Sequence, residues 1–319
     1  MKLKILLNAL LFILLLEFNL FAQASSIYSR FGLGNVEYSY SARRLALGDL
    51  GLTIEDRDFL SNLNPAAWNK IGLTRVELGA TFAGNFTSSQ TQNNYFAGSF
   101  FSGFMIGIPI SKDYGVGGVV GIVPFSKIGY EVVNTSNSNF SENKKGEGGV
   151  SKLFVGTSYR LPFDLSLGAS LDYYFGNLNY TSEIIFNDDA STNSKFRNIH
   201  RLKGLGFSFG LISPDFSKMI QIKNVDNIKF AFTANLIGNV TGDTTLTKSS
   251  GFIIDTVSSG KVKYSIPMRI GFGLGFRLNE SYQFALDFIT QNWSEYKIAD
   301  RIQPELQSSS RIKDRKSVV

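Results

Sequence analysis

The stretch YSIPMRIGFGLGFRL, residues Tyr264–Leu278, alternates between apolar side chains and small or charged ones. Every second position is apolar: Tyr264, Ile266, Met268, Ile270, Phe272, Leu274, Phe276 and Leu278. Because successive side chains of a strand point to opposite faces, this pattern predicts one long β-strand with an apolar face. At about 3.3 Å per residue, a strand of this length could cross a bilayer when tilted.

The same alternation recurs over residues 73–298, most clearly in Leu165–Phe175, Leu205–Leu211 and Ile228–Leu236. Polar stretches separate these segments, and the longest, Asn134–Gly149 and Gly238–Gly260, are predicted to be large loops. Long loops that alternate with tight turns are typical of an antiparallel meander. We therefore predict an all-β fold with roughly ten antiparallel strands.

The position of the apolar face separates two architectures. It points inward in a soluble sandwich and outward to lipid in a membrane barrel. Strand length and the glycine- and serine-rich second face favour a transmembrane β-barrel, and a soluble or surface sandwich is the alternative. In a barrel, isolated charges on the second face are expected to line the lumen: Asp172, Lys229, Arg269, Arg277 and Asp287.

Residues 1–24 have the features of a secretory signal peptide. Lys2 and Lys4 precede the apolar run Leu6–Leu16, and Ala22-Gln23-Ala24 is a small-x-small cleavage site. The alternative is an N-terminal membrane anchor, but the apolar run is shorter than the roughly 20 residues of a spanning helix. An exported barrel is expected in the outer membrane of a bacterial cell, with membrane lipid as its surroundings.

Two segments lack the alternation. Residues 25–72 contain Asn64-Pro65-Ala66, in which Pro65 restricts Asn64 to an extended conformation and makes it a turn or cap residue. This segment is predicted to be a small N-terminal hatch or plug domain. Residues 299–319 are predicted to be a polar, basic tail.

Composition excludes several classes of function. The chain has 319 residues, no cysteine and one histidine, so zinc fingers, thiol catalysis and iron–sulfur ligation lack their ligands. The net charge of +6 includes the basic tail and is too small and scattered to indicate nucleic-acid binding. His200 lies between Arg197 and Arg201 and has no identifiable serine partner. We expect no catalytic residues, no metal site, no cofactor and no enzyme activity.

Several ordered motifs resemble the FadL-type outer-membrane transporters of hydrophobic compounds. That family has an Asn-Pro-Ala motif in its hatch, which Asn64, Pro65 and Ala66 match. It also has a late hairpin with a Pro and an Arg-x-Gly strand, followed by a strand that ends in Asp and then Trp-Ser. The corresponding residues are Ile266–Phe276, Ala285–Asp287 and Asn292–Tyr296, and the opening Tyr28–Gly34 suggests an uncharacterised branch.

The resemblance implies a passive transporter of hydrophobic small molecules, with a hydrophobic ligand as its partner. The alternative is a PorV-like barrel, which would act as an interaction or shuttle protein in secretion without small-molecule transport. One departure is clear, because the family has about four further strands after Trp-Ser. From this comparison the chain is expected to be a C-terminally truncated or frameshifted copy with an incomplete barrel, and the alternative is a smaller barrel with a divergent end.

Overall fold

A computed structural model describes residues 26–38, 41–49, 51–88, 93–135, 139–188, 191–251, 253–279 and 281–318. Its strands form antiparallel pairs and helices are few and short, so the predicted all-β fold class is confirmed. The predicted signal peptide, residues 1–24, lies outside the described residues. Within the described part of the chain, every helix is too short or too polar to cross a membrane.

The chain divides into two compact units. One includes Thr81–Phe100, where the rings of Phe86 and Tyr95 lie with their centroids 4.5 Å apart. The other unit, Ser25–Ala80 with Phe101–Val319, holds the remaining elements.

Short helical turns dominate the N-terminal part and also interrupt the strands later. They are η1 (Ile27–Arg30), α2 (Ala42–Ala46), η2 (Pro65–Lys70), η3 (Pro162–Asp164), α3 (Ser217–Ile220) and η4 (Trp293–Glu295). The strands are β1 (Asn35–Val36), β2 (Arg75–Ser88), β3 (Asn93–Ser111), β4 (Val116–Asn134), β5 (Phe140–Arg160), β6 (Ser166–Phe186), β7 (Ser194–Ile212), β8 (Val225–Ser250), β9 (Ile253–Ser265), β10 (Arg269–Leu278), β11 (Tyr282–Gln291), β12 (Lys297–Ile298), β13 (Arg301–Ile302) and β14 (Ser309–Val318).

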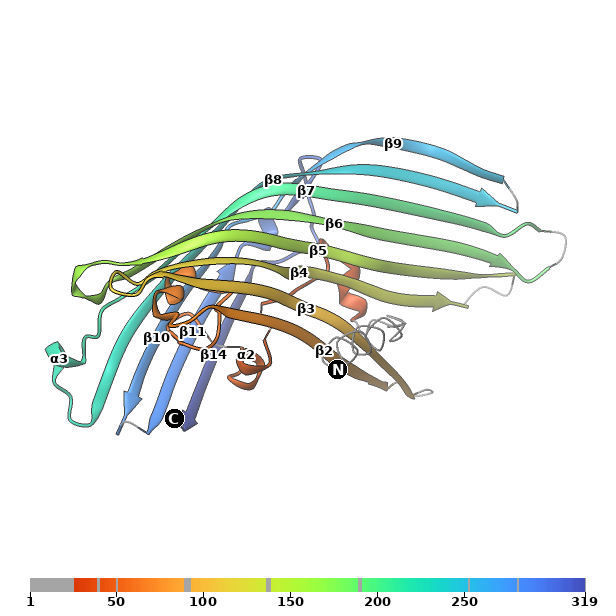
Figure 1. The fold of residues 1–319 in the computed structure, drawn as a ribbon. Coiled ribbons are helices and arrows are strands. Elements are labelled where there is room, and N and C mark those ends of the chain that lie inside the picture. Colours follow the sequence, from red (N-terminus) through yellow and green to blue (C-terminus); the bar gives the residue numbers. More distant parts are fainter. Residues whose placement is uncertain are drawn as a thin grey trace, which may run out of the picture. The chain divides into compact units, whose positions relative to one another are not determined.

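The strands from β2 to β9 follow one another in the sheet in sequence order, and β5 to β8 lie side by side in Figure 1. Strand β8 is the longest and pairs with β7 on one side. On its other side, residues 225–235 pair with β10 and residues 240–250 pair with β9. Strands β11 and β14 then extend the sheet beyond β10.

The prediction of one strand over Tyr264–Leu278 is wrong. Strand β9 ends at Ser265, β10 begins at Arg269, and the intervening Pro267 has no N–H with which to continue a ladder. The break also exchanges the two faces. Tyr264 is buried, whereas Phe272, eight residues later, is 52% exposed. The continuous alternation in the sequence therefore hides two strands whose apolar residues face opposite sides.

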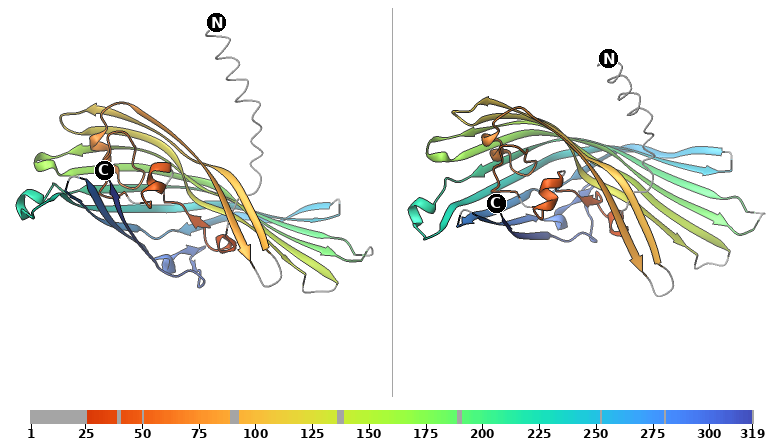
Figure 2. Two further views of the ribbon diagram at one scale, coloured as in Figure 1. Left: turned by 90° about the horizontal axis from the view of Figure 1, so that it is seen from below. Right: turned by 60° about the horizontal axis from the view of Figure 1, so that its bottom comes forward.

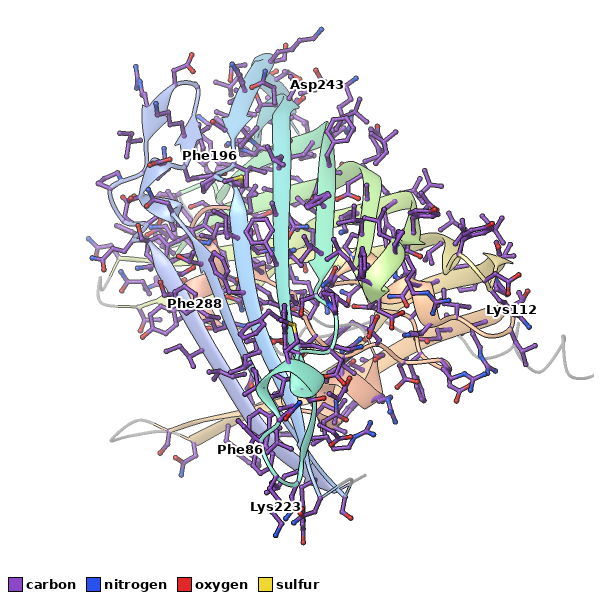
Figure 3. The ribbon with its side chains drawn as sticks, turned by 90° about the vertical axis from the view of Figure 1, so that its left-hand side faces the viewer. Phe86, Lys112, Phe196, Lys223, Asp243 and Phe288 are labelled. Atoms are coloured by element: carbon purple, nitrogen blue, oxygen red, sulfur yellow. The ribbon has the colours of Figure 1, made fainter. Side chains whose placement is uncertain are left out.

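The sheet has one face that contacts residues 26–72, called here the N-terminal segment, and one that does not. These are named the inner and the outer face. Cross-strand neighbours on the outer face form a continuous apolar row over seven strands: Tyr159, Leu167, Leu211, Phe232, Phe272, Phe288 and Ile312. Figure 3 shows Phe288 partway along β11, with Lys223 beyond one end of the strands and Asp243 toward the other.

The outer face is apolar over a limited height, here called the apolar band. On β6 it comprises five alternate residues, Leu167, Ala169, Leu171, Tyr173 and Phe175, after which Asn177 is exposed. The band therefore spans nine residues of this strand, within the range of 9–11 residues that a tilted transmembrane strand needs.

Beyond the band, strands continue where the sequence predicts loops. Residues 134–149 lie mainly in the β4–β5 hairpin, which pairs as far as Asn134 and Glu142, and residues 238–260 lie mainly in the β8–β9 hairpin. Both faces of these extensions carry polar side chains, so hydrophobic alternation does not reveal them. The prediction of two large loops is wrong for this reason.

The tail, residues 299–319, also contains strands. Ser309–Val318 forms β14, which pairs with β11 over its whole length. Arg311 and Lys313 are on the inner face and Ile312 is on the outer face, so the alternation is between cations and other residues rather than between polar and apolar ones. An apolar periodicity search cannot detect such a strand.

Candidate functional site

The Asn64-Pro65-Ala66 motif begins η2 and is buried against the inner face. Asn64 Oδ1 accepts a hydrogen bond from the Ala66 N–H at 3.0 Å, while Nδ2 donates to the Leu52 carbonyl at 2.7 Å. A second, longer bond of 3.4 Å joins Nδ2 to the carbonyl of Leu211 in β7. Pro65 occupies the first helical position, where its missing N–H costs nothing. One amide side chain therefore caps a helix and joins the N-terminal segment to the sheet.

Two glycines allow this close approach. Gly168 of β6 and Gly210 of β7 are cross-strand partners directly beneath the motif. A Cβ atom at Gly168 would overlap the backbone of Pro65 and Ala66, and one at Gly210 would overlap Asn64 Oδ1. The wall at this point is therefore shaped to fit the N-terminal segment.

Carboxylates and lysines hold the same segment to three other strands. Asp287 of β11 has no exposed surface, and its Oδ2 accepts hydrogen bonds from the N–H groups of Gly51 at 2.7 Å and Leu52 at 3.1 Å. Lys229 of β8 pairs with Glu55, and Lys313 of β14 pairs with Asp49. Figure 2 shows α2 and its neighbouring turns, in red and orange, beside the dark blue strands at the C-terminal end.

A second polar cluster lies within the wall itself. It consists of Lys152, Ser170, Asp172, Ser208, Asn235 and Arg269. Asp172 accepts hydrogen bonds from Ser170 and Ser208, and its Oδ2 lies 3.5 Å from the Lys152 ammonium. Arg269 Nε donates to Asn235 Oδ1 at 3.0 Å. Buried charges require such partners, because an unpaired buried ion is costly.

All five charged residues singled out from the sequence therefore lie on the inner face, but they do not form one site. Asp172 and Arg269 belong to the wall cluster, whereas Lys229 and Asp287 contact the N-terminal segment. Arg277 is separate from both, near the β10–β11 turn. Its Nε is buried and has no hydrogen-bond partner among the described residues.

Sequence reasoning missed the surroundings of Tyr38. Three cations lie over its ring: Arg311 at 4.3 Å, Lys313 at 5.1 Å and Arg269 at 5.3 Å from the centroid. Two of these cations come from the segment predicted to be a tail. An electron-rich ring at this point offsets part of the positive charge that the wall presents to the N-terminal segment.

Sequence reasoning also missed a pocket of about 300 Å³ beyond the level of the apolar band. Arg30 and Phe31 of the N-terminal segment form one side of it, and residues 303, 305 and 306 also line it. Its remaining wall is contributed by strands: Leu178, Tyr180, Asn198, His200, Tyr264 and Ile298. These residues are spread over 277 positions of the chain, Arg30 to Leu306, and no local motif connects them.

The wall of the pocket is mixed, with the rings of Phe31, Tyr180, His200 and Tyr264 beside polar and charged side chains. His200 Nδ1 hydrogen-bonds the Tyr264 hydroxyl, and the Tyr180 ring meets the imidazole edge to face at 5.7 Å. Burial lowers the pKa of His200 and raises that of Tyr264 to about 12, so both are neutral near pH 7. Arg201, which follows His200 in the sequence, is exposed on the outer face. Burial, not the adjacent arginines, is therefore what disfavours the imidazolium.

Polar atoms at the pocket remain available to a ligand. The side chains of Asn198, Arg30 and Glu305 have no hydrogen bond or ion pair to another described residue. Within the described ranges, no three or more His, Asp or Glu side chains are grouped as metal ligands would be. The arrangement is suited to binding an apolar ring with one or two polar substituents.

Comparison with known proteins places the sequence in a family. A family model described as BamG matches residues 1–313. The chain belongs to the BamG family. No curated protein matches this BamG-family chain. Among solved structures, the toluene transporter TodX of P. putida is similar at 14% identity, over 92% of this chain and 78% of TodX, with a TM-score of 0.49. The monoaromatic hydrocarbon channel CymD is similar at 14% identity, over 89% and 76%, with a TM-score of 0.47.

Proposed function

We propose that this protein is a bacterial outer-membrane β-barrel that binds hydrophobic small molecules and passes them across the membrane without catalysis. Residues 1–24 are its signal peptide, and residues 25–72 are a hatch that lies against the lumen side of the wall. The observation that carries the proposal is the pocket at His200, which the hatch and the wall line together with four rings, apolar side chains and a few polar groups.

The outer face supports a membrane location. Seven strands share one apolar row, and the band on β6 is nine residues long. In water such a surface would be a large exposed apolar patch, whereas in a bilayer it is the required contact with lipid. Each unpaired backbone group in lipid costs several kcal/mol, so a closed, smaller barrel is favoured over the incomplete one that the family comparison implies. Strands β2 and β14, which end the strand order, therefore gain partners there.

The inner face supports a lumen that the hatch occupies. Asp172, Lys229, Arg269, Arg277 and Asp287 line it, as expected for isolated charges on the second face of barrel strands. Two of these residues hold the hatch directly, through Gly51, Leu52 and Glu55. A ligand in the pocket touches both the hatch and the wall, so its binding is coupled to the position of the hatch.

Ligand size follows from the pocket. A volume of about 300 Å³ is at the small end of ligand sites, and the aromatic wall favours a compact apolar ring. His200, Tyr180 and Asn198 provide hydrogen-bonding groups at its edge. Substituted monocyclic and bicyclic aromatic compounds fit this description better than long acyl chains.

Filling the pocket tests the proposal. Asn198→Trp places an indole in the pocket, and Asn179→Trp is the matched control, because Asn179 is on the neighbouring strand but on the other face. Intact cells that produce the full chain are supplied with labelled 1-naphthol and toluene. We expect Asn198→Trp to reduce uptake about tenfold and Asn179→Trp to leave it unchanged. Equal uptake by both variants and by cells without the protein would refute transport.

A second candidate, the PorV-like interaction role, is favoured by the β8–β9 hairpin. Ile253, Ile254 and Val257 of β9 are 66%, 72% and 55% exposed, outside the apolar band. Ile254 and Val257 place apolar surface in a polar extension outside the band, and a protein partner would bury it. Under this role the full chain supports no 1-naphthol uptake, and replacing Ile254 and Val257 with serine should abolish a crosslink between this hairpin and a secreted protein. Uptake that Asn198→Trp reduces, without any crosslink at the hairpin, would reject this role.

A further inference from the structure

A groove of about 580 Å³ opens on the outer face at the edge of the apolar band. It lies between β7 and β8, where the register shifts by one extra residue of β8 between Gly204 and Gly206. Gly238, in the displaced part of β8, has no side chain with which to fill the gap. The apolar lining is contributed by Tyr173, Leu205, Phe207, Leu236 and Ile237.

Basic side chains begin directly beyond the groove. Lys203 lines it and is followed on the same face of β7 by Arg201, while Lys263 and Lys261 occupy the corresponding positions of β9. Cross-strand partners place these cations in two rows, Lys203–Thr241–Lys263 and Arg201–Asp243–Lys261. Neighbouring strands are about 4.8 Å apart, so each pair of cations spans about 10 Å across β8.

These charges are not compensated within the protein. All four cations are exposed, and none forms an ion pair with another described residue. The carboxylate of Asp243 is the one acidic group in the two rows, which leaves a net charge of +3 there. An anionic group with several oxygen atoms would satisfy both rows at once.

We propose that this surface binds a phosphorylated membrane lipid, with one acyl chain in the groove and the phosphate between Lys203 and Lys263. The inference rests on the proposed membrane location, because the groove opens toward lipid only if the apolar band does. Two observations point to a lipid rather than to a free phosphate. The groove is mainly apolar, and the cations lie at the height where a lipid headgroup would meet water.

Binding to the purified full chain in a neutral detergent tests the site. The probe is dioleoyl phosphatidate, and dioleoylglycerol and inorganic phosphate are compared with it. The variant Lys203→Gln with Lys263→Gln should bind phosphatidate about 25-fold more weakly, from two lysine contacts of about fivefold each. The control, Lys112→Gln with Lys223→Gln, removes the same charge from exposed turns at the other ends of the strands and should bind like the unaltered chain.

Each alternative outcome is decisive. Equal weakening in both double variants would show a response to net charge and overturn the site. Inorganic phosphate that competes as well as phosphatidate would show a phosphate site without use of the groove, and would overturn the lipid assignment. Failure of the chain to insert into phosphatidylcholine vesicles would instead refute the proposed membrane location. Retained gel mobility of unheated samples confirms that each variant is folded.

Discussion

A single arginine placed at two heights of β6 tests whether the outer face meets lipid. Leu171 is the middle residue of the five outward residues of the apolar band on this strand and is 44% exposed. Its cross-strand neighbours on the same face, Val155 and Phe207, are 57% and 60% exposed. Asn177 lies six residues further along the same face, which is about 20 Å at 3.3 Å per residue.

The expected magnitudes follow from depth. Leu171→Arg puts a charge at the centre of the band, where a lipid-facing arginine costs about 2–4 kcal/mol of unfolding free energy. Asn177→Arg puts the same charge beyond the band, where the cost falls to about 0–1 kcal/mol. Ser208 is not a suitable control, because its hydroxyl donates to Asp172 and a larger side chain would break that buried bond.

Urea unfolding in phosphatidylcholine vesicles, followed by tryptophan fluorescence, measures both variants. Trp68 and Trp293 are both buried and remote in sequence from the substitutions, so they report unfolding. A soluble sandwich with the same outer face exposed to water predicts changes within about 0.5 kcal/mol at either site. Equal small losses at Leu171 and Asn177 would therefore refute contact with lipid.

Three further predictions concern the N-terminal segment and the pocket. Gly168→Ala should displace Asn64-Pro65-Ala66, cost about 1–3 kcal/mol and expose residues 53–63 to protease, whereas Gly260→Ala should do neither, because its Cβ would have no neighbour within 4 Å. Equal cleavage of the two would contradict the packing. Asp287→Leu should release the N–H groups of Gly51 and Leu52 and increase proteolysis of the same loop, while Asp226→Leu near the turn should not. Burial lowers the pKa of His200 below 6.5 in the folded state, so the unfolded chain binds a proton at this imidazole more readily than the folded chain does. Stability is therefore fully present above about pH 6.5 and is lost as pH falls from there toward the folded pKa. His200→Gln should abolish this slope in urea titrations between pH 5 and pH 7, and a retained slope would assign it to other groups.

The sequence was sufficient to predict elements whose two faces differ in polarity. In β6, Leu167 to Phe175 alternate with Ser166 to Tyr174, and the predicted strand is present with its apolar residues outward. Polar extensions of β4, β5, β8 and β9 were missed, because their pairing depends on backbone hydrogen bonds that any sequence can make. Strand β14 was missed for a related reason, since its inner residues Arg311 and Lys313 are cations that contact Tyr38 and Asp49 of the N-terminal segment.

The candidate site was predictable from the sequence only at charged residues, because a charge within an otherwise apolar strand has few possible roles. Asp172, Arg269 and Asp287 were found because a charge within an apolar strand requires a partner. The pocket was not found, because Phe31, Tyr180 and Tyr264 are ordinary residues in isolation. His200 was noticed but was assigned no role, and only the fold brings it to Tyr264, 64 positions away.

The extra residue in β8 has a consequence for how this protein tolerates insertions and deletions. Below the bulge, Phe232 and Leu236 face outward at even positions; above it, Thr241 and Asp243 do so at odd positions. On the other side of β8, the strands β9 and β10 make the same change at the Ile266–Met268 break. The outward positions therefore switch between even and odd numbers at the same level in β8 and in its neighbours. Deleting one residue among 237–239 would remove the extra residue and restore a regular ladder, in which Val240 stays opposite Gly204 and points inward while Asp243 stays opposite Arg201 and faces outward. The bulge is therefore a place where β8 can lose one residue without exchanging its two faces.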